Sequence, residues 1–255
     1  MDDVTEIRPG VHLVRGTDTN WVILTEGDAV TLVDTGYPGD RERLVASLAA
    51  VGRRPEDLAA VLVTHAHADH IGSAEHLGAT HGVPVLMHRE EVPHARREFL
   101  HQVSAGRILK NAWRPGMLPW AARVLRAGGT EEVRVTDPRE HPVTLDLPGG
   151  PVPVHTPGHT LGHCGYHLPA AGVLITGDAL VTGYPTSRER GPQLLAAMFQ
   201  HDEDGALAAL RVLGGIDADV LLPGHGPAHH GSAAGAAERA HGTASRAGFS
   251  RTGAD

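Results

Sequence analysis

Histidine and aspartate gather in one short segment of the chain, Thr64-His65-Ala66-His67-Ala68-Asp69-His70. The segment directly follows an apolar run, Leu58 to Val63, that has the pattern of a buried strand. Side chains alternate along an extended backbone, so two histidines separated by one residue lie on the same side, within reach of one ion. The aspartate and the last histidine follow the turn and can face a second ion. Four nitrogen or oxygen ligands in six residues favour a metal site over a polar loop in which Asp69 caps a helix.

Three further residues with metal-binding side chains each stand just past a predicted strand and next to a glycine. They are His159, Asp178 and His225, which follow apolar segments at 152–155, 173–175 and 220–222. In open α/β architectures this edge of a sheet is where active sites collect. Isolated Gly-His or Gly-Asp pairs also occur in ordinary turns, but together these residues complete a set of seven ligands.

The seven side chains comprise five imidazoles and two carboxylates, with no thiolate among them. These donors suit zinc(II), with iron and manganese as other occupants. Two metals about 3.5–4 Å apart could activate a hydroxide between them, because each lowers the pKa of bound water toward ~7. Such a hydroxide would attack a carbonyl or phosphorus centre, while Asp69 carries a proton to the leaving group.

The complete set resembles the metallo-β-lactamase superfamily, with its His-x-His-x-Asp-His signature followed by His, Asp and His in the same order. The resemblance covers roughly residues 5–230. It implies that the first metal is bound by His65, His67 and His159, the second by Asp69, His70 and His225, and that Asp178 bridges both. Asp34 matches the aspartate of the family's early Asp-Thr-Gly element and would support the ligand loop, since metal-bound imidazoles need partners on their other nitrogen. A turn-capping role for Asp34 is equally compatible with the sequence.

Asp178 and the segment from Thr156 to Tyr166 indicate the branch of the superfamily. The superfamily's β-lactamases commonly carry Cys or Ser at the bridging position, so antibiotic hydrolysis is disfavoured. The segment is similar to glyoxalase II-like thioesterases and to lactonases, which implies cleavage of an ester, thioester or lactone. A strict glyoxalase II assignment is disfavoured, because the C-terminal helical region that binds glutathione has no obvious counterpart.

Two other activities stay open on the sequence. An iron-dependent persulfide dioxygenase would share the fold, but that branch uses a single iron with fewer ligands. A phosphodiesterase or nuclease is disfavoured by the formal charge of −8, which gives no general attraction to nucleic acid. A basic segment nevertheless keeps the nuclease open, because residues 94–128 hold seven Arg or Lys and only one acid, Glu98.

Residues 92–128 form a predicted basic helical insertion between the two halves of the chain. Trp113 and Trp120 could close over the metals and bind an apolar acyl group, with Arg107 and Arg114 meeting an anionic part of the substrate. The alternatives are that the aromatic residues pack the helices together, or that the insertion forms a homodimer contact. The role of the insertion stays open at this stage.

Two residues near the ligands have both a functional and a structural interpretation. Tyr184, in the loop after Asp178, could donate a hydrogen bond to an oxyanion, or could serve only the loop. His163 could support a ligand from behind, or could be a core histidine at the start of a strand. Cys164 is the single cysteine and is expected to be a small buried apolar residue.

The elements that must position the ligands form two similar halves. Strands are expected at 11–14, 21–24, 29–33, 58–63, 83–87, 133–135, 143–147, 152–155, 164–168, 173–176 and 220–222, and helices at 40–51, 71–81, 193–199 and 204–213. This order predicts an α/β fold, a four-layer αββα sandwich. Residues 1–238 would form a single domain and residues 239–255 a disordered tail.

The composition gives only general information about the class of protein. The 255 residues are 41% hydrophobic and 20% charged, which is typical of a globular chain. The first residues lack the basic start and apolar stretch of a secretion signal, and no run approaches the ~18 apolar residues of a membrane span. We therefore expect a cytoplasmic protein that acts on a small molecule.

Overall fold

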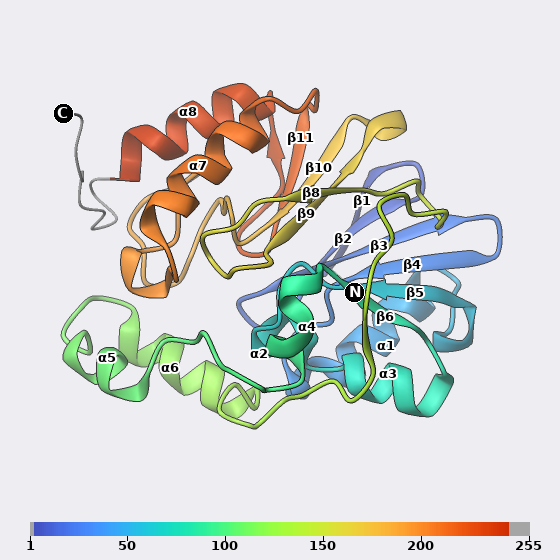
Figure 1. Ribbon diagram of the computed structural model, residues 1–255, viewed down its shortest axis with the longest axis horizontal. Coiled ribbons are helices and arrows are strands. Elements are labelled where there is room, and N and C mark those ends of the chain that lie inside the picture. Colours follow the sequence, from blue (N-terminus) through green and yellow to red (C-terminus); the bar gives the residue numbers. More distant parts are fainter. Residues whose placement is uncertain (1–2, 245–255) are drawn as a thin grey trace.

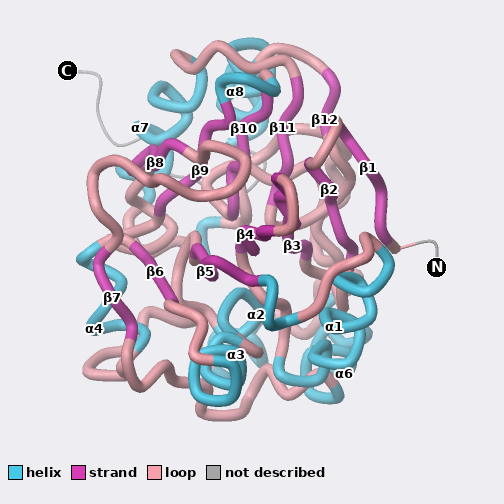
Figure 2. The backbone as a smooth tube through the Cα atoms, turned by 90° about the vertical axis from the view of Figure 1, so that its right-hand side faces the viewer, coloured by secondary structure: helices cyan, strands magenta, loops and turns pink. Residues whose placement is uncertain are grey.

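Two β-sheets packed face to face form the centre of the structure, and helices cover the outer face of each (Figures 1 and 2). The computed structural model describes residues 3–244. The layers follow the order helix, sheet, sheet, helix, with α1 and α3 on one side and α7 and α8 on the other. The expected αββα sandwich is confirmed.

The first sheet has seven strands in chain order. They are β1 (Val4–Arg8), β2 (Val11–Arg15), β3 (Asn20–Glu26), β4 (Ala29–Val33), β5 (Leu58–Leu62), β6 (Val85–Met87) and β7 (Pro138–Glu140). The first four strands pair antiparallel, and β4 to β7 pair parallel. The parallel pairing brings the C-terminal ends of β4 and β5 to the same edge.

The second sheet has five strands in the order β12-β11-β10-β9-β8. They are β8 (Val152–His155), β9 (Cys164–Leu168), β10 (Val173–Gly177), β11 (Val220–Pro223) and β12 (His229–His230). β10 and β11 are parallel, and both β8 and β10 pair antiparallel with β9. The chain therefore leaves β8, β10 and β11 at one end of the sheet.

Eight α-helices and five 3-10 turns complete the described part of the chain. The helices are α1 (Arg41–Ala50), α2 (Ala68–Ile71), α3 (Ala74–His81), α4 (Val92–Ala95), α5 (Ala105–Lys110), α6 (Met117–Arg126), α7 (Glu203–Gly214) and α8 (Ala233–Thr243). The 3-10 turns are η1 (Pro38–Asp40), η2 (Pro55–Asp57), η3 (Arg89–Glu91), η4 (Pro169–Ala171) and η5 (Ala197–Phe199). None of the helices within residues 3–244 combines the length and apolar character that crossing a membrane requires.

The apolar run in β3 shows how the sequence builds the layers. Trp21 and Ile23 belong to the core under α1 and α3, whereas Val22 and Leu24 belong to the core between the two sheets. Alternating side chains of one strand therefore fill two cores, which is why the run is continuously apolar. A third core lies between the second sheet and the helices α7 and α8.

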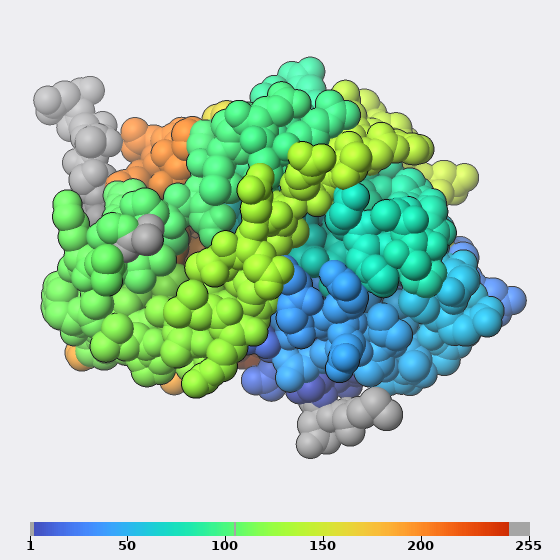
Figure 3. All heavy atoms as spheres, turned by 90° about the horizontal axis from the view of Figure 1, so that it is seen from below, coloured from blue at the N-terminus to red at the C-terminus, as the bar shows by residue number. Residues whose placement is uncertain are grey.

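The insertion at 92–128 contains α4, α5 and α6, so its expected helical character is confirmed. In Figure 3 its green atoms spread over one face of the molecule, and the yellow-green residues that follow run across that face. A small separate core of Met117, Trp120 and Met198 joins α6 to the second half of the chain. Ala95 of α4 belongs to the core of the first half, so the insertion packs against both halves of the chain.

Several expected elements are wrong or have different ends. Residues 133–135 and 143–147 are not strands, although Val133 and Val135 still reach the core and explain the apolar pattern. The expected helix at 193–199 is only the turn η5, and the expected helix at 71–81 is broken between α2 and α3. The strands β1, β7 and β12 and the helix α8 were not predicted from the sequence.

The expected tail also needs a correction. Helix α8 continues to Thr243, so residues 239–243 are helical rather than disordered. Ala233, Ala236 and Ala240 are buried against the second sheet's core, and this small-residue face allows α8 to lie close to α7. The rest of the expected tail, 245–255, lies outside the described residues.

Candidate metal centre

Loops that follow four strands bring all seven histidine and aspartate side chains to one region at the edge of the two sheets. The parallel pairs β4–β5 and β10–β11, together with β8, direct their C-terminal ends there. The side chains are His65, His67, Asp69 and His70 after β5, His159 after β8, Asp178 after β10, and His225 after β11.

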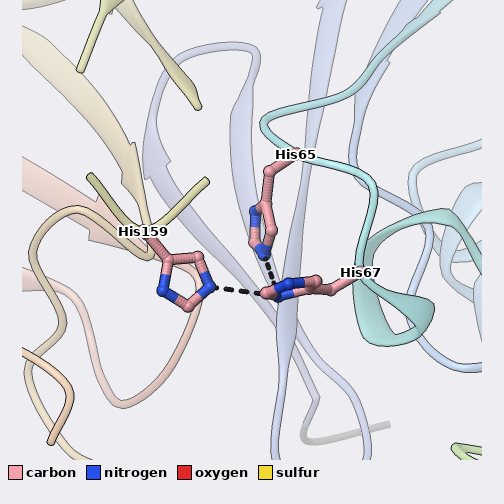
Figure 4. Close-up of side chains that lie close together, drawn as sticks. All are labelled: His65, His67 and His159. Atoms are coloured by element: carbon pink, nitrogen blue, oxygen red, sulfur yellow. Dashed lines mark hydrogen bonds between the residues drawn. The ribbon is translucent and has the colours of Figure 1, made fainter. Parts of the chain in front are cut away.

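The imidazoles of His65, His67 and His159 converge on one point (Figure 4). His65 Nε2 lies 2.9 Å from His67 Nδ1, and His159 Nε2 lies 3.1 Å from the same nitrogen. Burial and the surrounding imidazoles hold the pKa of His65 and His159 well below the ordinary value, and the pKa of His67 at about 4. Neutral imidazoles offer free lone pairs, which is the form that binds a metal.

Asp69, His70 and His225 form a second group whose ligand atoms lie within 4.8 Å of one another. Asp69 Oδ2 is 3.7 Å from His70 Nε2 and 3.5 Å from His225 Nε2. Burial alone would lower the pKa of His70, but nearby carboxylates, first that of Asp69, raise it to about 10. The negative surroundings favour a cation, and a metal bound at His70 would displace its proton.

Asp178 lies between the two groups. Its Oδ2 is 3.1 Å from His225 Nε2 and 3.5 Å from His159 Nε2. Its Oδ1 is 3.5 Å from His70 Nε2. Burial would raise the pKa of Asp178, but His225 and His70 hold it well below the ordinary value, so the carboxylate is ionised at neutral pH.

The donor atoms are arranged to bind metal ions rather than to form hydrogen bonds with one another. His70 Nε2 and Asp178 Oδ1 are buried, and neither has a hydrogen-bond partner among the described residues. Leaving a buried polar atom unpaired costs about 1–3 kcal/mol, and ligation by a metal would remove that cost. Imidazole and carboxylate donors without a thiolate are compatible with zinc, iron or manganese. The site therefore has the composition and the unpaired atoms of a metal centre.

Asp34 lies directly behind the ligand loop. Its Oδ1 accepts the backbone N–H of Thr64 at 2.8 Å, and its Oδ2 accepts the Thr64 hydroxyl at 2.7 Å and His70 Nδ1–H at 2.8 Å. Thr64 Oγ1 in turn lies 3.1 Å from His65 Nδ1. Asp34 thus orients one ligand directly and a second through Thr64, as expected of a partner for metal-bound imidazoles.

His163 lies behind Asp178. Its Nε2 accepts the backbone N–H of Asp178 at 3.0 Å, and its Nδ1 lies 2.8 Å from the Thr156 hydroxyl. Burial lowers the pKa of His163 to about 4, so the ring is neutral and can accept at Nε2. The structure therefore connects this histidine to a ligand through the ligand's backbone.

The contacts that Asp18 and Glu91 make at the ligand loops were not predicted from the sequence. The carbonyl oxygen of Asp18 accepts His225 Nδ1–H at 2.5 Å. Glu91 is buried and accepts the N–H of Ala66, which lies between two ligands in the chain. No local pattern marks either residue, because each reaches the site from a turn distant in sequence.

A cavity of about 690 Å³ opens over the ligands. His67, Asp69, His159, Asp178 and His225 all contribute to its lining. Many of its other lining residues are apolar and come from the insertion and from the loops around residues 184–199, among them Val103, Ile108, Trp120, Val124, Tyr184 and Phe199. Charged residues, Arg97, Glu131 and Glu132, also line it. The insertion is therefore a wall of the metal cavity.

The structure separates the two tryptophans of the insertion. Trp120 is buried and lines the metal cavity, as does Tyr184, whose ring lies 4.9 Å from that of His225. Trp113 is 80% exposed and lines a different cavity with Arg114. Arg107 lies beside a third cavity, which also reaches His159. Trp113 and Arg114 are therefore not brought to the ligands.

The four layers and the two adjoining candidate ligand groups at the strand ends define a protein of the αββα class with a candidate metal centre. The sequence profile described as the Metallo-beta-lactamase superfamily matches residues 14–225. The chain therefore belongs to the metallo-β-lactamase superfamily.

Three known proteins illustrate the similarity. The probable metallo-hydrolase YflN of Bacillus subtilis (strain 168) is 27% identical over 246 residues, which cover 87% of this chain and 85% of the relative. The hydroxyacylglutathione hydrolase of Alkalilimnicola ehrlichii is 33% identical over 146 residues, or 57% of this chain and 41% of the relative. The structure of a metallo-beta-lactamase family protein from Thermus thermophilus has a TM-score of 0.66 at 25% identity, covering 94% of this chain and 81% of that one.

Proposed function

We propose that this chain is a zinc-dependent hydrolase that binds two ions and cleaves an ester, thioester or lactone. The observation that carries the proposal is the position of Asp178, which lies within 3.5 Å of ligand nitrogens from both groups. A carboxylate shared in this way suits a bridge between two adjacent ions. The ions would be held by the three histidines on one side and by Asp69, His70 and His225 on the other.

When bound, zinc supplies Lewis acidity, lowers the pKa of water and polarises a carbonyl group. The chain's own residues position the substrate and transfer the proton to the leaving group. The ionised Asp178 offsets the positive charge at the centre of the site. Asp69, with a side chain 15% exposed, lines the cavity and is placed to pass a proton to the leaving group.

The cavity walls support a substrate with an apolar acyl part. Trp120, Ile108 and Phe199 surround the space next to the ligands, so an acyl chain would bury apolar surface there. The similarity to a hydroxyacylglutathione hydrolase supports thioester cleavage, since an acylglutathione is a thioester. Asp178 at the bridging position argues against a β-lactam substrate.

Metal analysis combined with a substrate panel tests this function. The purified chain should contain about two zinc ions and should hydrolyse acyl thioesters, aryl esters or lactones in preference to phosphodiesters and β-lactams. Asp178→Ala should lower metal content and turnover by orders of magnitude while the fold is retained. Asp137→Ala is a matched control, because Asp137 is an exposed carboxylate paired with Arg139.

Two results would contradict the proposal. Full turnover by the Asp178→Ala variant with one metal bound would remove the bridging role. A single equivalent of iron, with oxygen uptake on thiol persulfides and no hydrolysis, would replace the hydrolase by an oxidising activity.

A further inference from the structure

Glu91 is a fully enclosed carboxylate between the two loops that carry the three-histidine group. It ends the turn η3, directly after β6, and is 1% exposed. Its Oε2 accepts the backbone N–H of Ala66 at 2.8 Å and His94 Nδ1–H at 2.9 Å. Its Oε1 accepts the backbone N–H of Gly162 at 3.0 Å and the hydroxyl of Thr160. Both oxygens are therefore fully used by the protein.

These four contacts tie together parts of the chain that are distant in sequence. Ala66 stands between His65 and His67, and Thr160 directly follows His159. One carboxylate thus holds a residue adjacent to each of the three histidines, through the backbone of Ala66 and the hydroxyl of Thr160. A shift of either loop would break a charge-assisted hydrogen bond, which is stronger than a neutral one.

A second route connects Glu91 to a ligand through a side chain. His94, which is buried, donates from Nδ1 to Glu91 and accepts the backbone N–H of His101 at Nε2, at 3.3 Å. The carbonyl oxygen of His101 contacts Nε2 of His67. That contact leaves Nδ1 of His67 directed at the other two imidazoles. The tautomer and ring orientation of His67 therefore depend on a chain of hydrogen bonds that starts at Glu91.

We propose that Glu91 is the positioning residue of the three-histidine side of the metal centre. The inference rests on the proposed function, in that it takes metal ions to be the occupants of the site. Asp34 contacts the ligand loop from the other side, where it holds His70. Asp34 also reaches His65 through the Thr64 hydroxyl, whereas the hydrogen bonds of Glu91 are made only beside the three histidines.

The chemistry of Glu91 requires a carboxylate rather than an amide. All four partners donate to it, and two of them are backbone N–H groups that cannot reverse their role. A glutamine has the same shape but would turn its NH₂ group toward one of these pairs. One backbone N–H beside the histidines would then face a donor and lose its partner.

The test compares zinc and cobalt(II) binding by the full chain and its Glu91→Gln variant, measured by competition with a chelator. We expect one ion to bind about 10–100-fold more weakly in the variant and the other to keep its affinity. The cobalt absorption bands of the weakened site should change as well. Glu90→Gln is the matched control, because Glu90 is the exposed neighbour and should leave both affinities unchanged.

A purely structural role of Glu91 would give a different result. Thermal unfolding of the metal-free proteins measures that role separately. Thr160→Val removes a single contact, so it provides a milder variant if Glu91→Gln does not fold, and it should weaken the same ion by a smaller factor. Glu91→Asp, which keeps the charge, should restore part of the lost affinity.

Two outcomes overturn the inference and differ in their meaning. If the unaltered chain binds zinc normally and Glu91→Gln keeps both affinities, or loses both equally, only the positioning role fails. If the unaltered chain binds no metal, the proposed function fails and the inference fails with it.

Discussion

Asp34 Oδ2 lies 2.8 Å from His70 Nδ1, and both side chains are buried. Asp34 adopts a φ of 63°, in the left-handed region that non-glycine residues seldom occupy. This backbone turn directly follows β4. It directs the Asp34 carboxylate toward the ligand loop that follows the neighbouring parallel strand, β5. The uncommon conformation is thus coupled to the orientation of a candidate metal ligand.

Asp34→Asn should separate the backbone role of this residue from its charge. Asparagine tolerates the left-handed region, so the fold should be retained. The loss of the charged acceptor should weaken the ion held by Asp69, His70 and His225 by about 10–100-fold. Chelator competition measures this loss, with Asp137→Asn as the exposed control. Unchanged metal affinity together with lower stability would show that Asp34 only serves the turn.

Gly224→Ala should damage the metal centre without replacing any candidate ligand. A Cβ at this position would lie 2.2 Å from Asp178 Oδ1, so the carboxylate must move. We expect a large loss of bound metal and of hydrolysis. Gly242→Ala is the control, because a Cβ there meets nothing within 4 Å and alanine favours helix α8 by about 0.5–1 kcal/mol. Normal zinc content in Gly224→Ala would contradict this account of the site.

The candidate ligands that the structure brings together could be located from the sequence because their signal is local. His65 follows the end of the apolar strand β5, and Asp178 and His225 follow β10 and β11, each beside a glycine; the parallel pairing of β10 and β11 brings their two ends together. The αββα layers followed from the same alternation of strands and helices. These features depend on residues adjacent in the chain.

Two of the supporting residues, Glu91 and Asp18, could not be found in this way. Glu91 and Asp18 contact the ligand loops across 25 residues or more of chain. Periodicity carries no information on such pairs. Trp113 and Trp120 look alike in the sequence, but a turn between α5 and α6 leaves the first exposed and buries the second. The loop that contains Val133 and Val135 has the apolar alternation of a strand because both side chains reach the core, although the loop itself is not a strand.

The separation of the two tryptophans predicts different effects on substrate choice. Trp120→Ala should reduce kcat/KM for long-chain acyl esters more than for acetyl esters, because it removes an apolar wall beside the ligands. Trp113→Ala should leave this ratio unchanged, since Trp113 lies outside the metal cavity. Trp120→Ala also removes a core residue and should lower stability by about 3–5 kcal/mol. Equal ratios in both variants would show that Trp120 only packs the insertion.

The stability of the metal-free chain should depend on pH through Glu91. Burial would raise the pKa of this carboxyl, but its hydrogen bonds, first that from His94, lower it from 4.5 to about 2. A carboxyl with a lowered folded-state pKa contributes stability above its unfolded value, and the contribution is lost as the pH falls toward the folded value. The shift corresponds to a contribution on the order of 3 kcal/mol, present above about pH 4.5 and lost toward pH 2.

Urea unfolding of the metal-free chain and its Glu91→Gln variant measures this contribution. The difference in free energy of unfolding should be largest near neutral pH and should shrink as the pH falls through this window, because a protonated Glu91 resembles glutamine. Glu90→Gln should show no such dependence, since Glu90 is exposed. A constant difference across the window would mean that shape, not the charge of the buried carboxylate, accounts for the contribution of Glu91.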